Sequence, residues 1–367
     1  MSSAPRATIA VDARMIEASG IGTCISHWLP RLISARPEVV FALLGPARML
    51  ADFPWTREPN VRVIDVDAPI YSVREQIALH RRIPSDATLV WSPHYNIPLT
   101  WPGRLAVTVH DLSHLALPEF VQGVHRRAYA RFMFHRIARG ADAIMTDSEF
   151  TRSEFERLVG PARAKPQVVH LGVDREWFDA PASAAPHPTP YLLYVGNVKP
   201  HKNLGRLLQA FEMLATRPPC DLLIVGKKEG FLTGDSAVLA AADRLAPRVR
   251  LLGAVSQDLL KRYVAYAQAL VLPSLYEGFG LPPLEAMACG RPVVVSRAAS
   301  LPEICGDAAV YCDPLDPASI AAAITRVLED PGLQQQLRCR GIERAAGFTW
   351  DRSAQSVLTV LESVLRS

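Results

Sequence analysis

Several classes of protein are excluded by what this sequence of 367 residues lacks. No run of apolar residues approaches the roughly 18 that are needed to cross a bilayer, and the N-terminal residues contain no apolar signal region. The six cysteines form no Cys-x-x-Cys pair and have no metal-binding spacing, so we expect buried thiols in a reducing compartment. The net charge of +4 does not demand nucleic acid as a partner. We therefore expect a cytoplasmic protein, unless it is held at the inner face of a membrane.

The overall composition and the pattern of apolar segments are those of a globular α/β protein. Hydrophobic residues make up 49% and charged residues 21% of a chain that is long enough for two ordinary domains. Short apolar runs that are typical of buried strands alternate with helix-compatible segments. Residues 181–190 are the segment richest in proline and alanine, which predicts a linker. We place a domain boundary between residues 172 and 188.

The most informative stretch covers residues 270–296. It begins with a short apolar run that stops at Pro273, and it closes with a second run at residues 292–296. Between them lie a glycine-rich turn, residues 277–280, and a helix that begins at the Pro282-Pro283 pair and ends at Gly290. This order predicts a parallel βαβ unit whose turn lies at the carboxyl edge of the sheet, where open α/β sheets bind ligands.

Two carboxylates bracket that turn. Glu277 precedes the glycines, and Glu285 lies in the first turns of the helix. The glycines allow a ligand to approach the backbone, and the unpaired N–H groups at a helix start attract phosphate. Carboxylates in the same place accept hydrogen bonds from sugar hydroxyls, so the constellation suits a nucleotide sugar. The alternative for Glu285 alone is a carboxylate that only complements the helix dipole.

Residues 277–294, EGFGLPPLEAMACGRPVV, and residues 301–314, LPEICGDAAVYCDP, resemble the donor-site signature of the retaining glycosyltransferases of family 4. The resemblance covers most of the chain. It implies the GT-B architecture, an α/β fold in which two Rossmann-like domains face each other across a cleft and the C-terminal helix returns to the first domain. The implied parts are an acceptor-side domain over residues 1–175, a donor domain over residues 176–348, and the returning helix over residues 349–367.

A turn with two lysines at the start of the second domain is the expected phosphate site. A strand, residues 191–195, runs into Gly196 and then into the lysines, before a helix starts, which makes an anion site on physical grounds. By resemblance, Lys202 neutralises the leaving diphosphate. Many family members have arginine at the position of Asn197, so this chain departs from the pattern there, and Lys199 is a candidate substitute.

His110 is the leading candidate for a catalytic residue in the first domain. It ends a predicted strand, and residues 109–120, VHDLSHLALPEF, resemble a family segment whose histidine points at the donor sugar. The alternative is a core histidine whose hydrogen bonds are satisfied within the fold.

Two other turns of the first domain follow predicted strands. Gly20 and Gly22 come after the first strand, and by resemblance their loop lies near the acceptor and the donor phosphates. Tyr95 and Asn96 follow the strand at residues 89–91, where they offer a sugar platform on the acceptor side or only cap the sheet.

The remaining expected contacts are carried over from the resemblance. Glu285 holds the ribose, Glu277 holds a hydroxyl of the transferred sugar, and the backbone near Val255 meets the nucleobase. The expected catalytic residues are His110, Glu277 and Lys202, and the expected donor-binding residues are Gly22, Gly196, Asn197, Lys199, Lys202, Gly226, Lys227, Val255, Phe279, Gly280, Leu281 and Glu285.

Residues 125–139, HRRAYARFMFHRIAR, are helix-compatible and rich in arginine. One interpretation is a solvated face over a packed apolar stripe. The other is attraction to anionic lipid or to a phosphate-bearing acceptor.

The function that these features favour is a retaining glycosyltransferase that moves a sugar, mannose from GDP-mannose as the first choice, to a saccharide or polyprenol-linked acceptor of surface polysaccharide synthesis. A UDP-sugar such as UDP-glucose is the alternative donor. We expect neither a cofactor nor a metal, because the diphosphate charge is met by Lys202 and a helix start. A retaining glycosidase built on Glu277 and Glu285, and a non-catalytic two-lobed binder of sugars or nucleotides, are the alternatives from other classes.

Overall fold

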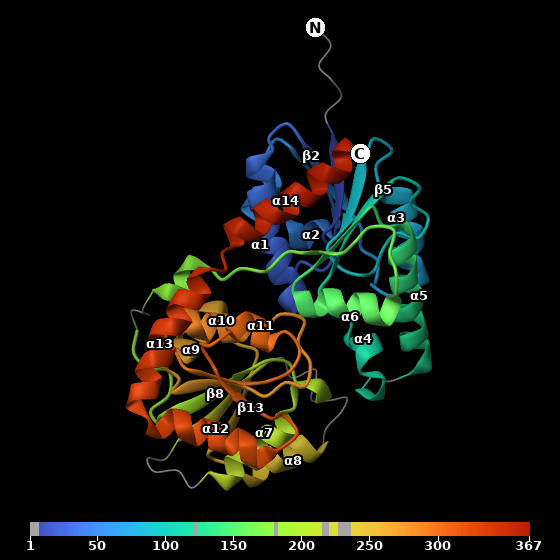
Figure 1. Ribbon diagram of the computed structural model, residues 1–367. Helices are drawn as coiled ribbons and strands as arrows, with labels where there is room; N and C mark the ends of the chain where they lie inside the picture. Colours follow the sequence, from blue (N-terminus) through green and yellow to red (C-terminus); the bar gives the residue numbers. More distant parts are fainter. Residues whose placement is uncertain (1–6, 121–122, 180–182, 215–219, 227–235) are drawn as a thin grey trace. The chain divides into compact units, whose positions relative to one another are not determined.

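The computed structural model describes residues 7–120, 123–179, 183–214, 220–226 and 236–367 (Figure 1). The chain divides into two compact units. Unit 1 consists of residues 1–172 together with residues 350–367, and unit 2 consists of residues 173–349. The expected α/β fold with two parallel sheets is confirmed. Among the described residues, no helix is both long and apolar enough to cross a membrane.

The described strands of unit 1 form one parallel sheet of seven strands in the order β3-β2-β1-β4-β5-β6-β7. Its order reverses between β1 and β4, which is the switch point at which such sheets bind ligands. The strands are β1 (Thr8–Asp12), β2 (Val40–Gly45), β3 (Val61–Asp65), β4 (Leu89–Ser92), β5 (Arg104–Val109), β6 (Ala143–Thr146) and β7 (Gln167–Val168). The helices are α1 (Ser19–Ala35), α2 (Ala47–Leu50), η1 (Pro54–Arg57), α3 (Val73–Arg82), α4 (Ser113–Ala116), η2 (Pro118–Phe120), α5 (Val124–Gly140), α6 (Glu149–Val159) and α14 (Trp350–Arg366).

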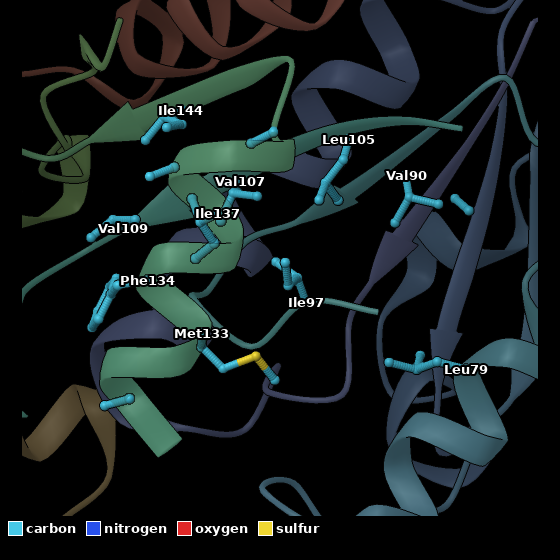
Figure 2. Close-up of a cluster of buried hydrophobic side chains, with 14 of the residues drawn as sticks. Leu79, Val90, Ile97, Leu105, Val107, Val109, Met133, Phe134, Ile137 and Ile144 are labelled. Carbon is cyan, nitrogen blue, oxygen red and sulfur yellow. The ribbon is translucent and has the colours of Figure 1, made fainter. Parts of the chain in front are cut away.

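Part of the core of unit 1 lies between α5 and the sheet (Figure 2). Met133, Phe134 and Ile137 lie on one side of α5 and are fully buried against apolar side chains of β5 and β6, among them Val107 and Ile144. The central strands are apolar almost without interruption because helices cover both faces of a parallel sheet.

The C-terminal helix α14 completes unit 1 by packing on α1. The indole N–H of Trp28 donates to the hydroxyl of Ser353 over 2.8 Å, and the rings of His27 and Trp350 stack with centroids 4.5 Å apart. Arg36 at the end of α1 also pairs with Glu362 of α14. The last helix in sequence therefore belongs to the first unit in sequence.

The described strands of unit 2 form a parallel sheet of six strands in the order β10-β9-β8-β11-β12-β13, which reverses between β8 and β11. The strands are β8 (Tyr191–Val195), β9 (Asp221–Val225), β10 (Val249–Gly253), β11 (Ala269–Leu272), β12 (Val293–Ser296) and β13 (Val310–Cys312). The helices are η3 (Arg175–Phe178), η4 (Pro200–Lys202), α7 (Leu204–Met213), α8 (Ser236–Arg244), α9 (Gln257–Tyr266), α10 (Leu281–Ala288), α11 (Leu301–Cys305), α12 (Pro317–Glu329) and α13 (Pro331–Ala346).

The segment predicted as a linker is attached to unit 2 where the structure describes it. Tyr266 donates to the carbonyl of Ser183, and His187 pairs with Asp221 over 2.7 Å. The chain instead passes between the units at residues 172/173 and 349/350. The two segments on the unit 2 side lie together, because the N–H of Val173 donates to the carbonyl of Phe348 over 3.0 Å. Proline content therefore marked a segment near the boundary, but side-chain hydrogen bonds hold it to the second sheet.

All six cysteines are free thiols. Cys24, Cys220, Cys305 and Cys312 are buried, as expected. Cys289 is partly exposed and Cys339, on α13, is exposed, so the expectation of burial is wrong for Cys339.

Candidate active site

The strongest candidate site in unit 2 is the switch point between β8 and β11. Lys202 ends η4 in the turn after β8, and Glu277 lies in the turn after β11. The ammonium of Lys202 lies 2.6 Å from Oε2 of Glu277, and the hydroxyl of Ser274 donates to Oε1 over 2.7 Å. Two of the predicted catalytic residues, 75 positions apart, are thus brought into contact. The carboxylate of Glu277 is largely buried, whereas Lys202 keeps about a fifth of its side chain exposed (22%).

Two side chains fix the shape of these turns. Asn203 has a left-handed backbone (φ 62°), and its amide donates to the carbonyls of Pro273 (2.9 Å) and Pro314 (2.7 Å). The hydroxyl of Ser300 contacts the carbonyls of Glu277 (2.9 Å) and Phe279 (2.6 Å). The lysine turn is therefore held by hydrogen bonds from Asn203 to the backbone after two other strands, and the glycine turn by contacts of its own carbonyls with Ser300, which preorganises the site.

Glycine is required at two positions of this edge. A Cβ on Gly226 would lie 2.0 Å from the carbonyl oxygen of Gly196, so the ends of β8 and β9 approach closely only because residue 226 has no side chain. Gly280 has φ 121°, which disfavours any other residue, and it precedes the first residue of α10, Leu281. The predicted helix start is confirmed within a residue, with Pro282 and Pro283 in its first turn.

Glu285 lies in α10 and has an unusual carboxyl group. Burial raises its pKa to about 8, and the carboxylate of Asp174 adds to the rise. No hydrogen bond or ion pair to this carboxyl is formed by any residue that the structure describes. A half-buried acid without a partner is a frequent mark of a ligand site, because the ligand supplies the missing hydrogen bonds. This result favours the binding role over the helix-dipole alternative.

The other predicted donor contacts are placed as follows. Lys199 is exposed in the turn before η4, and the N–H of Gly226 donates to the carbonyl of Gly253 at the neighbouring strand end. Val255 lies between β10 and α9. The backbone carbonyl oxygen of Asn197 accepts a hydrogen bond from the hydroxyl of Tyr194 over 3.5 Å. Lys227 lies outside the described residues.

In unit 1, His110 follows β5 and is bound at both ring nitrogens. Nδ1 lies 2.7 Å from Oδ2 of Asp147, which follows β6, and Nε2 lies 2.9 Å from the carbonyl oxygen of Pro93, which follows β4. Burial is the largest single effect and lowers the pKa of His110, but the charge and hydrogen bond of Asp147, together with the carbonyl of Pro93 and the carboxylate of Asp111, outweigh it, so the net pKa lies above the ordinary value. Sequence reasoning missed Asp147, although its place directly after a buried strand was a usable signal.

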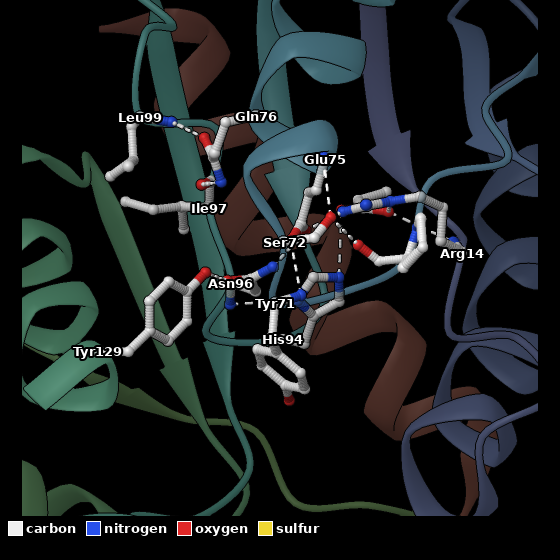
Figure 3. A network of polar contacts seen from close by, with 12 residues as sticks. Arg14, Tyr71, Ser72, Glu75, Gln76, His94, Asn96, Ile97, Leu99 and Tyr129 are labelled. Carbon is white, nitrogen blue, oxygen red and sulfur yellow. Dashed lines mark hydrogen bonds and ion pairs between the residues drawn. The ribbon is translucent and has the colours of Figure 1, made fainter. Parts of the chain in front are cut away.

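A second network of polar side chains, at the carboxyl edge of the unit 1 sheet, surrounds Glu75 (Figure 3). Its carboxylate is completely buried, pairs with Arg14 over 2.5 Å, and accepts hydrogen bonds from the amide of Asn96 and the N–H of Tyr71. The amide oxygen of Asn96 also accepts from Tyr129. Asn96 is only 1% exposed, so its predicted role as a sugar platform is wrong: both ends of its amide are used inside the protein. Tyr95 stacks on Phe134 and is partly buried.

Gly20 and Gly22 do not form a loop, which corrects the prediction for both. They lie in the first turn of α1. A Cβ on Gly22 would lie 2.2 Å from the carbonyl oxygen of Ile16, so the glycine allows the preceding turn to pack against the helix. Packing of the chain on itself therefore explains Gly22 without a ligand.

The sequence contains one Asp-x-Asp pattern, Asp65-Val66-Asp67, a pattern that can bind a metal ion. Asp65 accepts a hydrogen bond from the N–H of Ala47 over 2.9 Å, and Asp67 lies 3.7 Å from Arg48. In the parts of the chain that are described, no group of three or more His, Cys, Asp or Glu side chains could hold a metal ion.

Comparison with known proteins agrees with this fold. Residues 175–344 match the family described as "Glycosyl transferases group 1". The chain is 34% identical to O-antigen chain mannosyltransferase B of Escherichia coli over 264 residues, which cover 68% of this chain and 67% of that protein. It is 32% identical to the glycogen synthase of Mycobacterium tuberculosis over 228 residues, which cover 61% of this chain and only 55% of that protein.

Among solved structures, sucrose-phosphate synthase from Thermosynechococcus elongatus superposes with a TM-score of 0.78 at 20% identity, over 98% of this chain and all of that one. The two α/β units with parallel sheets and this similarity show the GT-B fold. The chain belongs to the group 1 glycosyltransferases, which confirms the family resemblance of the donor-site stretch. The protein is thus an enzyme that transfers sugars.

Proposed function

We propose that this glycosyltransferase moves mannose from GDP-mannose, with retention of configuration, to a saccharide or polyprenol-linked acceptor during surface polysaccharide synthesis. The observation that carries the proposal is the carboxyl of Glu285, half-buried and without a partner among the described residues, in the second turn of the helix that follows the glycine turn. Ribose hydroxyls are donors of the kind this group lacks. The similarity to an O-antigen chain mannosyltransferase supports both the sugar and the pathway.

In this proposal, Lys202 and the backbone N–H groups of Phe279 and Gly280 bind the leaving diphosphate and stabilise its negative charge. Lys202 is held by Glu277 in a fixed place, so little reorganisation is needed when negative charge develops on the leaving group. Both oxygens of Glu277 are engaged, by Lys202 and Ser274, but each keeps a second lone pair that can accept a hydrogen bond from a hydroxyl of the transferred sugar. Charge neutralisation by a lysine makes a metal ion unnecessary, and the nucleotide sugar is a substrate, so no cofactor is required.

A glucose donor such as UDP-glucose is the second candidate, because the chain is also 32% identical to a glycogen synthase, although over 228 residues against 264 for the mannosyltransferase. The two alternatives from other classes lose support. Family membership argues against a non-catalytic binder. In a glycosidase, Glu277 would need an oxygen free for acid or nucleophilic work, whereas both of its oxygens are engaged by Lys202 and Ser274.

A thermal-shift screen against GDP-mannose, UDP-glucose and ADP-glucose tests the donor. A ligand present at 100 times its dissociation constant adds about 2.7 kcal/mol to the free energy of unfolding, which is readily detected. We expect the largest shift with GDP-mannose, and a slow release of nucleotide from the same donor when no acceptor is present. A larger shift with UDP-glucose would replace the donor. No shift with any nucleotide sugar, and no turnover, would refute the function.

We further propose that α5 contacts an anionic membrane surface, where a polyprenol-linked acceptor would lie. The helix has no acidic residue, and its exposed face carries Val124 (81% exposed) and Phe132 (49% exposed) among arginines. None of these arginines forms an ion pair with a residue in the described ranges. Cations around exposed apolar side chains match an anionic lipid surface. The arginines are Arg126, Arg127, Arg131, Arg136 and Arg139.

Co-sedimentation with vesicles tests this contact. The wild-type protein should bind vesicles that contain phosphatidylglycerol and should not bind neutral vesicles, and high salt should release it. The double variant Arg131→Gln/Arg136→Gln should bind more weakly. The double variant Arg57→Gln/Arg81→Gln removes the same charge from exposed positions elsewhere in unit 1 and should bind as the wild type does. Equal loss in both double variants would show that only net charge matters.

A further inference from the structure

The contact between His110 and Asp147 is fixed by the pairing of their strands. Val109 of β5 is in register with Thr146 of β6, so the next residue of each strand, His110 and Asp147, emerges at the same level of the carboxyl edge. Nδ1 of His110 lies 2.7 Å from Oδ2 of Asp147. The sheet thus places a carboxylate beside the imidazole without help from a flexible loop.

The second ring nitrogen decides the protonation state. Nε2 of His110 lies 2.9 Å from the carbonyl oxygen of Pro93, and a carbonyl oxygen can only accept a hydrogen bond. The carboxylate of Asp147 also accepts. A neutral imidazole donates from one nitrogen only, and its other nitrogen would point a lone pair at an oxygen. While Asp147 is ionised, both contacts are satisfied together only when His110 carries two protons and a positive charge.

The surroundings of the pair agree with a buried cation and anion. Asp147 is 3% exposed, and its Oδ1 has no hydrogen-bond partner, so His110 is the principal compensation for its charge. The ring of Trp28 lies nearly parallel to the imidazole (12°) with centroids 6.1 Å apart, a distance at the outer limit of cation–π attraction. The other titratable groups that act on the pair are Asp111 beside His110, Cys24 of α1, and His170 after β7.

We propose that Asp147 is a positioning residue that keeps His110 as an imidazolium with its ring fixed across the ends of β4, β5 and β6. His110 then serves the transfer reaction as a permanent cation and not as a proton acceptor, a statement that rests on the proposed function. The proton stays on Nε2, shared with the carbonyl of Pro93, throughout turnover. This assigns a role to Asp147 that is distinct from support of the fold.

Histidine side-chain NMR on the full-length protein tests the charge without any ligand. The His110 signal is identified by its loss in His110→Gln. In the wild type it should keep the imidazolium shift at pH 7.5. In Asp147→Asn the attraction is gone and burial remains, so the ring should lose its proton below the ordinary pKa of about 6.5. Asp147→Glu, which restores the charge, should restore protonation. A wild-type ring that is neutral at pH 7.5 overturns the proposal even if Asp147→Asn does not fold.

Turnover of GDP-mannose supplies the second readout. The Asp147→Asn enzyme should approach the wild-type rate only on the acid side of the pKa of its imidazole, and above that pKa it should lose about tenfold per pH unit relative to the wild type. His110→Gln should be slow at every pH. Asp142→Asn is the matched control: it removes a carboxylate that pairs with Arg163 at the opposite end of β6, and its pH profile should follow the wild type.

The NMR titration and the turnover assay together distinguish failure of this inference from failure of the proposed function. If the wild type turns over no nucleotide sugar but the NMR titrations behave as described, the donor assignment fails and the charge on His110 stands. If the wild type is active and the rate ratio of Asp147→Asn to wild type is the same at pH 6 and pH 8.5, Asp147 has only a structural role.

Discussion

Donor affinity should rise with pH between 6 and 8 because of Glu285. Burial raises the pKa of its carboxyl to about 8, with Asp174 adding to the rise, so the free protein holds this group mostly protonated at neutral pH. Ribose hydroxyls that donate hydrogen bonds favour the ionised form. Binding of the donor at neutral pH must therefore expel a proton from Glu285.

The magnitude follows from the ionised fraction of this carboxyl. With a pKa of about 8, about half of it is ionised at pH 8 and about 1% at pH 6, so the dissociation constant of the donor should be about 50-fold higher at pH 6. Glu285→Gln is the matched variant, because it keeps the shape of the side chain and cannot ionise. Its affinity should be lower than that of the wild type at pH 8 and constant between pH 6 and pH 8.

Titration calorimetry with GDP-mannose measures both quantities. The diphosphate of this donor is esterified at both ends and has no group that titrates in the interval, so the protons counted in buffers of different ionisation enthalpy come from the protein. Close to one proton should leave per donor bound at pH 6.5 in the wild type, and fewer in Glu285→Gln. A wild-type affinity that is constant with pH, or a dependence that persists in Glu285→Gln, would refute the reasoning.

The other predictions concern the two lysines of the lysine turn, the metal independence of turnover, the effect of Glu285 on stability without donor, and the α1–α14 contact. Lys202→Ala should lower turnover more than Lys199→Ala, because only Lys202 is fixed by Glu277, and equal losses would refute the division of roles. Turnover should survive chelator, and its loss with recovery on added magnesium or manganese would refute the metal-free proposal. Without donor, the stability contribution of Glu285 is complete below about pH 4.5 and lost as the pH rises to about 8, so the melting temperature of Glu285→Gln relative to wild type should be higher at pH 8.5 than at pH 5. Ser353→Ala leaves the buried indole N–H of Trp28 without its acceptor and should cost about 1–3 kcal/mol of unfolding free energy in urea denaturation, whereas Ser356→Ala should cost little.

The features that sequence reasoning predicted well are local ones. The strand at residues 191–195, the glycine turn and the proline-started helix of the donor stretch follow from apolar runs and from Gly and Pro signals that act over a few residues. Family resemblance then supplied the identity of the donor loop, because its spacing of Glu277 and Glu285 is distinctive.

The features that it missed depend on residues far apart in the chain. Glu75 begins an amphipathic helix and has the pattern of a solvated residue, yet it is completely buried because Arg14, from the end of β1, neutralises it. Gly22 has the pattern of a loop glycine, yet it lies inside a helix, where the close approach of the Ile16 carbonyl explains why residue 22 has no side chain. The pairing of His110 with Asp147 follows from the register of β5 and β6, which single-sequence patterns do not define.

The return of α14 to unit 1 has a consequence for synthesis of the chain. Unit 2 is inserted between α14 and the rest of unit 1, so a ribosome delivers all of residues 173–349 before the helix that covers α1. Until then the α14-facing side of α1, with Trp28 and its indole N–H, has no cover. Domains generally fold as units during translation. Unit 2 can therefore fold before unit 1 has its last helix. A chain whose synthesis stops after residue 349 would expose the apolar surface of α1 that α14 covers in the complete protein.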